Sequence, residues 1–582
     1  MRHVQILHRI SLTQNFQENL SKFHTEYEYN PLKSGEIRLL RIRRSKSRDG
    51  YVRCSIFHTE LSKASDYVAV SYTWGDPSDK IGIICGHGGE SMQVTHNCAT
   101  ILQRLRALNL DITVWIDAIC INQSDIAERN SQVRLMSKIY AGAFQVLVDL
   151  GGESEDSNIA IDTIEAPAGY SQKPNSTQIT AVAALLNRPW FKRAWVLQEV
   201  YFSKGTEVFC GMRRFEWLDV VSWFITNQHL EGVEGVPCPV LVSMDRYQGP
   251  YKAASNLLHL LYRTQGCQST DPRDKVFALL GMLSDSLDVG LVADYNKTTR
   301  TVYLELAIAL LHMHGIALLT CAQTGSSIED LPSWVPDWSL PPENMAEREG
   351  IAGPDATPWR QFRTGRTQKF ADFEVLHKDT SRPTLKVNGF LIDTVSSVVE
   401  LLDTSTCPWK DIQETYVRLY SKVLQLPAFT WASTTDTNDV VLFRTFTHTH
   451  SLPFNAIIDD FRVLLGKQPV RESYKEADAE KLKKKVRVNI HNQAVCLTTH
   501  NVLGLLPRQT QVSDTICVLP GCPMPLVMRH SGSHWTLIGP CYVDALMHNW
   551  GSVESWIVRL AATVNDENSE PKDLRLREFL IE

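Results

Sequence analysis

Apolar and polar residues alternate in two neighbouring segments near the start of the chain, EIRLLRI (residues 36–42) and YVRCSIFHTEL (residues 51–61). Alternation with a period of two is typical of a strand with one buried face, and the SRDG between the segments is a turn sequence. The two segments are therefore predicted to form a β-hairpin. A second hairpin is predicted in IGIICGHGGESMQV (residues 81–94), whose glycines we interpret as turn residues because no helix opens directly after them.

Three further segments are apolar almost throughout, namely YVAVSY (residues 67–72), VWID (residues 114–117) and VLVDL (residues 146–150). Continuous apolar runs are typical of strands that are covered on both faces. Apolar residues at helical spacing lie between these runs, over 98–108 and 126–140, and Asp125 with Glu128 resembles a capping box at the start of the second helix. This order of elements predicts a parallel sheet with right-handed crossovers.

The rest of the chain changes character twice. ITAVAALLNR (residues 179–188) and PWFKRAWVLQEVYF (residues 189–202) are predicted to form a pair of helices, and TEVFC a further strand. Helical patterns then dominate from about residue 215 as far as a Pro- and Trp-rich connector at 331–343. Beyond it, TLKVNGFLIDTVSSV (residues 384–398) is predicted to be two strands about a turn, and short strands over 502–543 indicate a small β-sheet or barrel.

A chain of 582 residues is too long for one ordinary core. We expect an α/β fold with a mostly parallel sheet and flanking helices, followed by a helical region and a β-rich C-terminal module. The predicted parts are an N-terminal extension (1–35), an α/β core (36–215), a helical region (216–345) and a C-terminal α+β module (346–582).

Composition narrows the class of protein. The chain is 43% hydrophobic and 21% charged, which is ordinary for a soluble globular protein, and its net charge of -6 provides no basic surface for nucleic acid. The 13 cysteines contain no C-x-x-C pair and no zinc spacing, so we expect reduced thiols, a cytoplasmic location and no metal site. The N-terminal MRHVQILHRISLTQNFQ faintly resembles a mitochondrial presequence, although an ordinary helix or tail looks the same.

No apolar run reaches the roughly 20 residues that a membrane span needs. The nearest candidate is Ala307 to Leu319, which two histidines and a glycine interrupt. We therefore predict no membrane span.

Ligands of open α/β sheets bind outside the carboxyl ends of the strands. That rule selects SYTWGD (residues 71–76) after the first parallel strand and Asp117 to Gln123 after the second. Polar side chains at these positions either line a site or make local turn and cap hydrogen bonds, and Trp74 and Trp115 either stack on a substrate or pack in the core.

Another candidate lies in FKRAWVLQEV, where Trp195 and Glu199 are four residues apart and so share a helix face. A carboxylate held beside a packed tryptophan gains basicity when it is desolvated. The alternative is an ion pair with Arg193 or Lys192, or simple exposure.

Other motifs indicate less specific chemistry. Cys120 with a distant histidine could form a nucleophile pair, but a free cysteine at a strand end is usually a packing residue. DPRDK (residues 271–275) contains opposed charges that most simply cap and brace the following helix. The sequence contains no Gly-rich phosphate loop, G-x-S-x-G elbow or H-E-x-x-H motif.

Five motifs occur in an order that closely resembles the fungal heterokaryon incompatibility (HET) domain family. They are YVAVSYTWGD, VTHNCATILQRLR, WIDAICINQSDIAERNSQVRLMSKIYAGAFQVLV, RPWFKRAWVLQEV and DPRDKVFALLGM. The resemblance covers about residues 36 to 300. The C-terminal GLLPRQTQVSDTICVLPGCPMPLVMR and LIGPCYVDALM look like the tail of multidomain HET proteins, but Ser513 and Ala545 stand where glycines are expected, and the usual acidic ending of that motif is absent.

The resemblance implies a role in nonself recognition after fusion of genetically different fungal cells, with the HET domain as an executor of programmed cell death. HET domains also resemble divergent TIR domains, which have a flavodoxin-like sheet and a W-x-x-x-E helix motif that matches Trp195 and Glu199 here. Catalytic TIR domains cleave the nicotinamide-ribose bond of NAD. By that resemblance NAD is a possible substrate and no cofactor is needed.

The resemblance also implies a role for particular residues. Glu199 would be the catalytic carboxylate, and the expected substrate-binding residues are Ser71, Tyr72, Trp74, Gly75, Asp76, Asp117 and Trp195. The loop that corresponds to a TIR assembly loop would contain Cys120, Asn122, Gln123 and Asp125.

Three functional hypotheses follow. The first is a cell-death effector that hydrolyses NAD on self-association and responds to an incompatibility partner protein. The second is a non-catalytic scaffold that recruits a partner through its HET surface. The third is a Cys120-dependent hydrolase.

Overall fold

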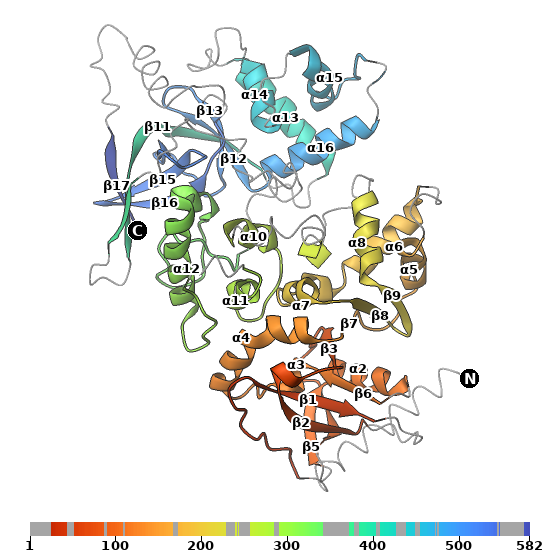
Figure 1. Ribbon diagram of the computed structural model, residues 1–582. Coiled ribbons are helices and arrows are strands. Elements are labelled where there is room, and N and C mark those ends of the chain that lie inside the picture. The colour runs from red at the N-terminus through yellow and green to blue at the C-terminus, as the bar shows by residue number, and fades with distance from the viewer. Residues whose placement is uncertain are drawn as a thin grey trace. The chain divides into compact units, whose positions relative to one another are not determined.

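The computed structural model describes residues 25–43, 52–85, 90–108, 111–166, 173–227, 239–240, 242–243, 257–283, 290–340, 372–376, 383–402, 408–425, 438–447, 454–471, 473, 476–543, 546 and 576–582. The chain forms two compact units, Met1–Lys297 and Thr298–Glu582. The single division falls inside the helical region predicted for 216–345, so that region is shared between the two units (Figure 1).

A sheet of seven strands forms the core of the first unit, in the order β2-β1-β6-β3-β7-β8-β9. The strands are β1 (Glu36–Ile42), β2 (Cys54–Glu60), β3 (Val68–Tyr72), β6 (Ile112–Trp115), β7 (Gln145–Asp149), β8 (Thr206–Cys210) and β9 (Arg213–Glu216). Strands β6, β3, β7 and β8 are parallel, whereas β1, β2 and β9 pair antiparallel at the two edges. The predicted α/β class and first hairpin are confirmed.

The parallel strands follow a known topological pattern. Numbered in chain order, they lie 2-1-3-4, which is how the flavodoxin-type order 2-1-3-4-5 begins. Strands β4 (Lys80–Cys85) and β5 (Glu90–Thr95) form a separate antiparallel ribbon, as the second predicted hairpin requires, and its turn lies outside the described residues.

Helices surround this sheet. They are η1 (Leu61–Lys63), α2 (His96–Ala107), α3 (Asp117–Cys120), α4 (Ile126–Gly142), α5 (Ser157–Ile164), α6 (Ser176–Leu186), η2 (Pro189–Lys192), α7 (Val196–Phe202), α8 (Trp217–Asn227), α10 (Leu257–Thr264) and α11 (Asp274–Leu280). Asp125 is the N-cap of α4, as predicted, and its carboxylate accepts hydrogen bonds from the backbone of Ala127 and Glu128. In Figure 1, α7 lies between the strands and the α10–α11 pair, and it packs on both α4 and α11.

The predicted helix over residues 189–202 is wrong in one respect, because the structure breaks it into η2 and α7. Arg193 between them has extended backbone angles (φ -79°, ψ 140°) and forms a parallel bridge with Gln268. The backbone N–H of Ala194 donates to the Gln268 carbonyl at 2.9 Å. Pairing with a distant segment, which residue spacing does not reveal, therefore overrides the local helical pattern.

The second unit is built on a sheet of eight strands. These are β10 (Phe373–Leu376), β11 (Thr384–Leu402), β12 (Gln493–Thr498), β13 (Leu503–Pro507), β14 (Thr515–Val518), β15 (Leu526–Ser531), β16 (His534–Pro540) and β17 (Arg577–Ile581). Strand β11 pairs with both β14 and β17, and the pairs β14–β15, β15–β16 and β16–β17 close a ring of five strands. The predicted β-rich C-terminal module is confirmed.

The strand pair predicted over residues 384–398 is instead one strand, β11. The Asn388–Gly389 dipeptide, which indicates a turn in sequence, pairs in register with β17. A Cβ at Gly389 would lie 2.3 Å from Leu519 Cδ2 and 2.9 Å from the Val518 carbonyl oxygen. The glycine is therefore required by close packing, not by a turn.

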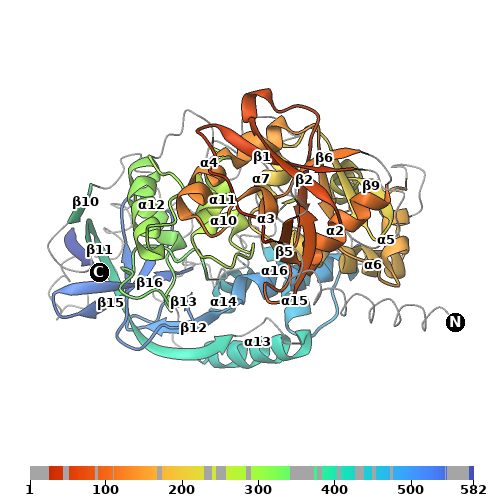
Figure 2. The same cartoon turned by 90° about the horizontal axis from the view of Figure 1, so that it is seen from below.

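Helices complete the second unit. They are α12 (Thr299–His314), η3 (Gly315–Cys321), α13 (Trp409–Val423), α14 (Asn438–Thr447), α15 (Phe454–Leu464) and α16 (Glu476–Ile490). The helices α13 to α16 gather at the β12–β13 end of the sheet, away from β17 (Figures 1 and 2). Helix α16 has the sequence EADAEKLKKKVRVNI and is rich in charged residues.

Among the described residues, one helical stretch, Thr299–Cys321, is long and apolar enough to cross a membrane by length and composition alone. It contains the apolar run predicted at 307–319 and extends beyond both ends of that run, with α12 ending at His314 and η3 beginning at Gly315. More than half of it is buried within its unit, and η3 packs against β16. Buried core helices have the same length and composition, so this is weak evidence for a span.

Ser513, which stands where the resemblance leads us to expect a glycine, has a φ of +78°. Ala545, the other such position, lies outside the described residues. Side chains with a Cβ are strained at positive φ, by about 1–2 kcal/mol. Ser513→Gly is therefore expected to raise the free energy of unfolding by about 0.5–1 kcal/mol, after the extra entropy of an unfolded glycine is subtracted.

Urea unfolding of the wild type and the variant measures this change. Ser513→Ala is the control, since it removes the hydroxyl but keeps the Cβ. A lower stability for the glycine variant, or an equal gain in both variants, would contradict the explanation by backbone strain.

Candidate functional site

The Glu199 side chain, carried by α7, is only 2% exposed. Its Oε2 accepts a hydrogen bond from Ser71 Oγ at the carboxyl end of β3, and the Tyr140 hydroxyl of α4 is a second donor. Trp190 of η2 donates its indole N–H to the same Ser71 Oγ at 2.8 Å. Ser71 therefore links the tryptophan to the carboxylate, and four elements meet at one buried acid.

Burial raises the pKa of Glu199 from 4.5 to about 7. The Arg193 guanidinium and the hydrogen bonds from Ser71 and Tyr140 act in the opposite direction, whereas the negative charge of Asp117 raises the pKa further. Desolvation is thus the main cause, because a charged carboxylate without water is disfavoured. A carboxylate with a pKa near 7 is suited to act as a base or nucleophile at neutral pH.

A second acid lies beside this group. Asp117 follows β6 directly and is half-buried, and its Oδ2 accepts a hydrogen bond from the Trp74 indole at 2.8 Å. Burial raises the pKa of Asp117, and Arg193 and Trp74 oppose that rise. Arg193 donates to the backbone carbonyl of Tyr72 at the end of β3. The structure thus brings two carboxylates and one guanidinium together where the parallel strands end, as the strand-end rule leads one to expect.

Several predicted substrate-binding residues have partners elsewhere. The Tyr72 side chain is buried, and only its backbone carbonyl reaches the cluster, where it accepts a hydrogen bond from Arg193. Asp76 is exposed, and its Oδ1 accepts hydrogen bonds from the backbone and hydroxyl of Ser78 at 2.8 and 2.7 Å. These are turn interactions, which the sequence left open as the alternative for Asp76.

Gly75 and Trp195 also have clear structural reasons for their identity. Gly75 has a φ of +79°, and a Cβ there would lie 2.8 Å from Asn97 Nδ2. Trp195 precedes α7, and its indole N–H bonds to Asp274 rather than to Glu199 or Ser71. Of the predicted set, Ser71, Trp74 and Asp117 are the side chains that the structure gathers near Glu199.

Sequence reasoning missed three members of the cluster. Tyr140 was predicted only as an apolar helix residue, Trp190 was not considered, and Arg193 was named only as an alternative ion-pair partner of Glu199. Tyr140 and Trp190 are buried, and each directs a polar atom toward the cluster. A periodic pattern of apolar residues shows burial but not the direction of a polar atom. The two tryptophans and two arginines within RPWFKRAW were the available signal for Trp190 and Arg193.

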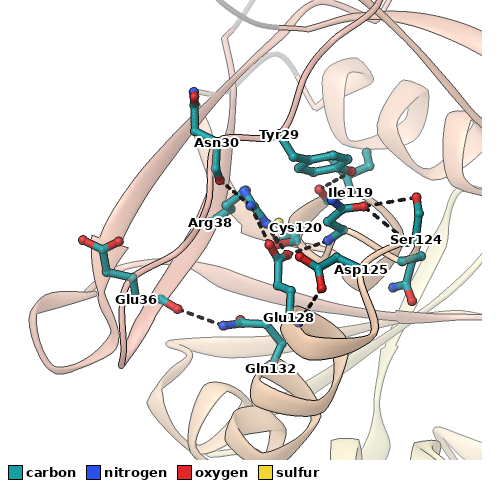
Figure 3. Close-up of polar contacts among 12 residues, drawn as sticks. Tyr29, Asn30, Glu36, Arg38, Ile119, Cys120, Ser124, Asp125, Glu128 and Gln132 are labelled. Atoms are coloured by element: carbon teal, nitrogen blue, oxygen red, sulfur yellow. Dashed lines mark hydrogen bonds and ion pairs between the residues drawn. The ribbon is translucent and has the colours of Figure 1, made fainter. Parts of the chain in front are cut away.

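The polar residues after β6 are held by a buried ion pair, drawn in Figure 3. Arg38 of β1 has no exposed surface, and its guanidinium binds both carboxylate oxygens of Glu128 at 2.5 and 2.9 Å. The same guanidinium donates to the carbonyls of Cys120, at 3.1 Å, and Asn30, at 2.7 Å. The Tyr29 hydroxyl adds a hydrogen bond of 3.0 Å to the Ile119 carbonyl. Arg38 of β1 and Tyr29, in the segment that precedes β1, thus both hold the backbone that follows β6.

Within this loop, the side chains of the predicted assembly residues make local hydrogen bonds. Gln123 donates to the Asp117 carbonyl at 3.0 Å, and Asn122 accepts from the backbone and hydroxyl of Ser124. Asp125 caps α4. Any role of these residues in assembly stays a prediction.

Cys120 is fully buried, and burial raises the pKa of its thiol to about 12. Its Sγ accepts a hydrogen bond from the Ile116 backbone N–H at 3.4 Å. A thiolate is required for nucleophilic attack. The structure therefore offers no support for a hydrolase that depends on Cys120.

No group of three or more His, Cys, Asp or Glu residues that could hold a metal ion occurs in the part of the chain that the structure describes. The side chains of the cluster around Glu199 are carboxylates, hydroxyls, indoles and a guanidinium. Such a group can hold a cationic centre, deprotonate a bound group, or form a covalent ester.

One family model and one relative match the chain. The family model described as "Heterokaryon incompatibility protein (HET)" matches residues 67–199, a span that begins just before β3 and ends at Glu199. The chain is 28% identical to "Heterokaryon incompatibility protein 6, OR allele" of Neurospora crassa, in a match that covers 53% of this chain and 58% of that protein. It thus spans less than two thirds of that relative.

No solved structure matches the chain. The family match includes Ser71, Trp74, Asp117, Trp190 and Glu199, which are the residues that meet at the carboxyl ends of β3 and β6. On this evidence, residues 67–199 of the chain are similar to the heterokaryon incompatibility (HET) family.

Proposed function

We propose that the protein is a cytoplasmic effector of fungal nonself recognition, which triggers programmed cell death when an incompatible partner protein is present. The HET family match and the name of the Neurospora relative support a role in incompatibility. The partner would act as the trigger, and the HET domain as the executor.

The mechanism that we propose is hydrolysis of the nicotinamide-ribose bond of NAD. The observation that carries this proposal is the buried Glu199 carboxylate, with a pKa near 7, at the carboxyl end of a parallel sheet. As the C1′–N bond breaks, nicotinamide leaves as a neutral molecule with the bonding electrons and C1′ becomes cationic. The Glu199 carboxylate stabilises that cation or bonds to it, and water then adds to C1′ and loses a proton.

The neighbouring residues suit this substrate. The nicotinamide ring of NAD is already cationic, so its departure requires no general acid. Asp117 is half-exposed beside the half-buried Trp74 indole, and together they offer a negative charge and an aromatic face to a cationic ring. Arg193 could bind a phosphate or ribose oxygen once it is released from the Tyr72 carbonyl.

Activity would be conditional. Glu199 is bonded to Ser71 and almost fully buried in the single chain, so NAD can reach it only after α7 or the loop that carries Trp74 moves. We propose that self-association drives this opening. Such a switch would protect the host cell, because an unregulated NAD hydrolase is lethal.

The same burial favours a second candidate, a non-catalytic scaffold in which the HET surface recruits a partner. In that case Glu199 serves only as a buried hydrogen-bond acceptor for Ser71. Cell death in a fungal host separates the two candidates. Glu199→Gln keeps the size and an acceptor oxygen, so a scaffold would still kill, whereas an enzyme would not.

The pH dependence of nicotinamide release provides a further test. Because the carboxylate must be ionised, we expect the rate to rise with pH along an acid limb centred near 7, the raised pKa of Glu199. The folded state holds this proton more tightly than the unfolded state, so the contribution of Glu199 to stability falls as pH rises from about 4.5 to 7. A rate that is flat between pH 5 and 8, or a limb near 4.5, would contradict the role of a desolvated Glu199.

A further inference from the structure

The DPRDK motif lies in a segment that is hydrogen-bonded to the backbone between η2 and α7. Residues 265–281 run along this backbone, where the Ala194 N–H donates to the Gln268 carbonyl at 2.9 Å and the Gln268 N–H donates to the Lys192 carbonyl. These bonds hold Arg193 in an extended conformation. The direction in which α7 starts, and with it the position of Glu199, is therefore set by a segment about 70 residues further along the chain.

Asp274 is the first residue of α11, and its side chain contacts Trp195. Its carboxylate accepts a hydrogen bond from the Tyr295 hydroxyl at 2.6 Å and a second from the Trp195 indole N–H. Trp195 is the residue from which α7 begins, and the Glu199 N–H bonds to its carbonyl at 3.4 Å. One turn of helix thus separates the anchored indole from the Glu199 carboxylate.

The anchor itself is rigid. The Tyr295 ring lies against the Arg129 guanidinium, whose carbon is 3.4 Å from the ring centroid, and Arg273 approaches the ring at 5.2 Å. The Tyr295 backbone N–H donates to Asn130 at 2.8 Å. Both α4 and α11 therefore hold the tyrosine in place.

Arg273 completes the motif. It binds Asp271 through two nitrogens, at 2.9 and 2.7 Å, and donates to the carbonyls of Tyr295, at 2.8 Å, and Lys297, at 2.6 Å. From sequence, the simplest interpretation was that the opposed charges of DPRDK cap and brace the helix that follows. In the structure they also hold the backbone at Tyr295 and Lys297.

A second attachment lies one turn further along α7. Gln198 donates to the Phe277 carbonyl at 3.3 Å, and its side-chain oxygen lies 3.0 Å from the position of a Cβ at Gly281. Gln198 thus faces α11, whereas the next residue, Glu199, faces Ser71. The helix is held on one side by α11 and on another by β3.

We propose that Asp274 is a positioning residue that acts through Trp195 to hold Glu199 against Ser71. The inference rests on the proposed function only for its consequence in catalysis. It also means that the HET site is completed by residues outside the matched span of 67–199, since Asp274 and Tyr295 both follow that span.

The test uses the full chain with Asp274→Asn, Trp195→Phe and the double variant. Asparagine fits the space but has one acceptor oxygen in place of two and no charge, and phenylalanine keeps an aromatic ring without the N–H. Asp162→Asn is the matched control, because it is the same substitution at an exposed carboxylate of the first unit that pairs with Arg213.

Two readouts are measured, namely hydrogen exchange of the amides of α7 and the rate of nicotinamide release from NAD. Exchange in Val196–Phe202 is expected to accelerate in Asp274→Asn and Trp195→Phe but not in the control. Each of the two variants is expected to lower kcat by about 10- to 100-fold with KM nearly unchanged, and the double variant should be no worse than the more severe single one.

The outcomes distinguish this inference from the proposed function. A wild type that releases no nicotinamide, combined with faster exchange in Asp274→Asn and Trp195→Phe alone, would refute NAD hydrolysis and support the positioning of α7. Exchange that is unchanged in α7, or that rises equally in Asp162→Asn, would overturn the role of Asp274 whatever the activity. Losses of kcat that add in the double variant would also overturn it.

Discussion

Glu199→Gln is expected to lower nicotinamide release from NAD by at least about 10²- to 10³-fold, because it removes the charge that stabilises the cationic ribose. Glutamine has nearly the same shape and keeps an oxygen that can accept the Ser71 hydrogen bond. The variant should therefore fold. At pH 8 its stability should equal or exceed that of the wild type, since a buried negative charge has been removed.

The control for this prediction is Glu165→Gln, the same substitution at a partly exposed carboxylate that pairs with Arg213. That variant should retain the wild-type rate. The unfolding midpoint of each variant is measured beside its rate, so that a loss of fold is not mistaken for a loss of catalysis. Nicotinamide release that persists undiminished in a folded Glu199→Gln protein would remove Glu199 from the mechanism.

Arg38→Met is expected to destabilise the first unit by about 3–5 kcal/mol, the largest effect on stability that we foresee. The substitution leaves the Glu128 carboxylate, whose side chain is only 9% exposed, without its cationic partner. It also removes the guanidinium donors to the Cys120 and Asn30 carbonyls. The loop that follows β6 would lose most of its support (Figure 3).

Denaturant unfolding, followed by tryptophan fluorescence, measures the loss. Arg213→Met is the matched control, since Arg213 pairs with Asp162 and Glu165 at the surface and its removal should cost about 0–1 kcal/mol. Replacing both partners, in Arg38→Met with Glu128→Leu, should restore much of the stability because no charge is left buried alone. A loss for Arg38→Met no larger than that of the control would show that the buried ion pair contributes little.

The sheet of the first unit was predictable because a parallel strand is buried on both faces and therefore reads as a continuous apolar run. The same patterns placed Ser71 and Asp117 at the carboxyl ends of neighbouring strands, where the structure brings them close to Glu199. Period and topology were sufficient for these residues, since both depend on short stretches of sequence.

Residues whose partners are distant in sequence were not predictable in this way. Arg38 lies in a strand that alternates like a half-exposed one, yet it is fully buried because Glu128, on α4, supplies the opposite charge. Arg193 breaks an apparently continuous helix because its backbone pairs with Gln268. In both cases the decisive interaction joins segments more than 70 residues apart, and no local pattern contains it.

The second unit shows the same limit in a strand. Asn388–Gly389 is a strong local turn signal, but its backbone is paired with β17, which comes last of the strands in chain order. Ser513 is the opposite case, in which departure from the family pattern coincides with a left-handed backbone that favours glycine. A family resemblance can thus indicate a backbone conformation that composition and periodicity do not.

The most direct test of the central proposal is to incubate the purified wild-type protein with NAD, at high concentration and with self-association enforced by fusion to an oligomeric partner. Nicotinamide and ADP-ribose are then separated and quantified over time. We expect both products in equal amounts, at a rate that rises with self-association. NAD that remains intact in the oligomeric protein would contradict an enzymatic role and favour the scaffold.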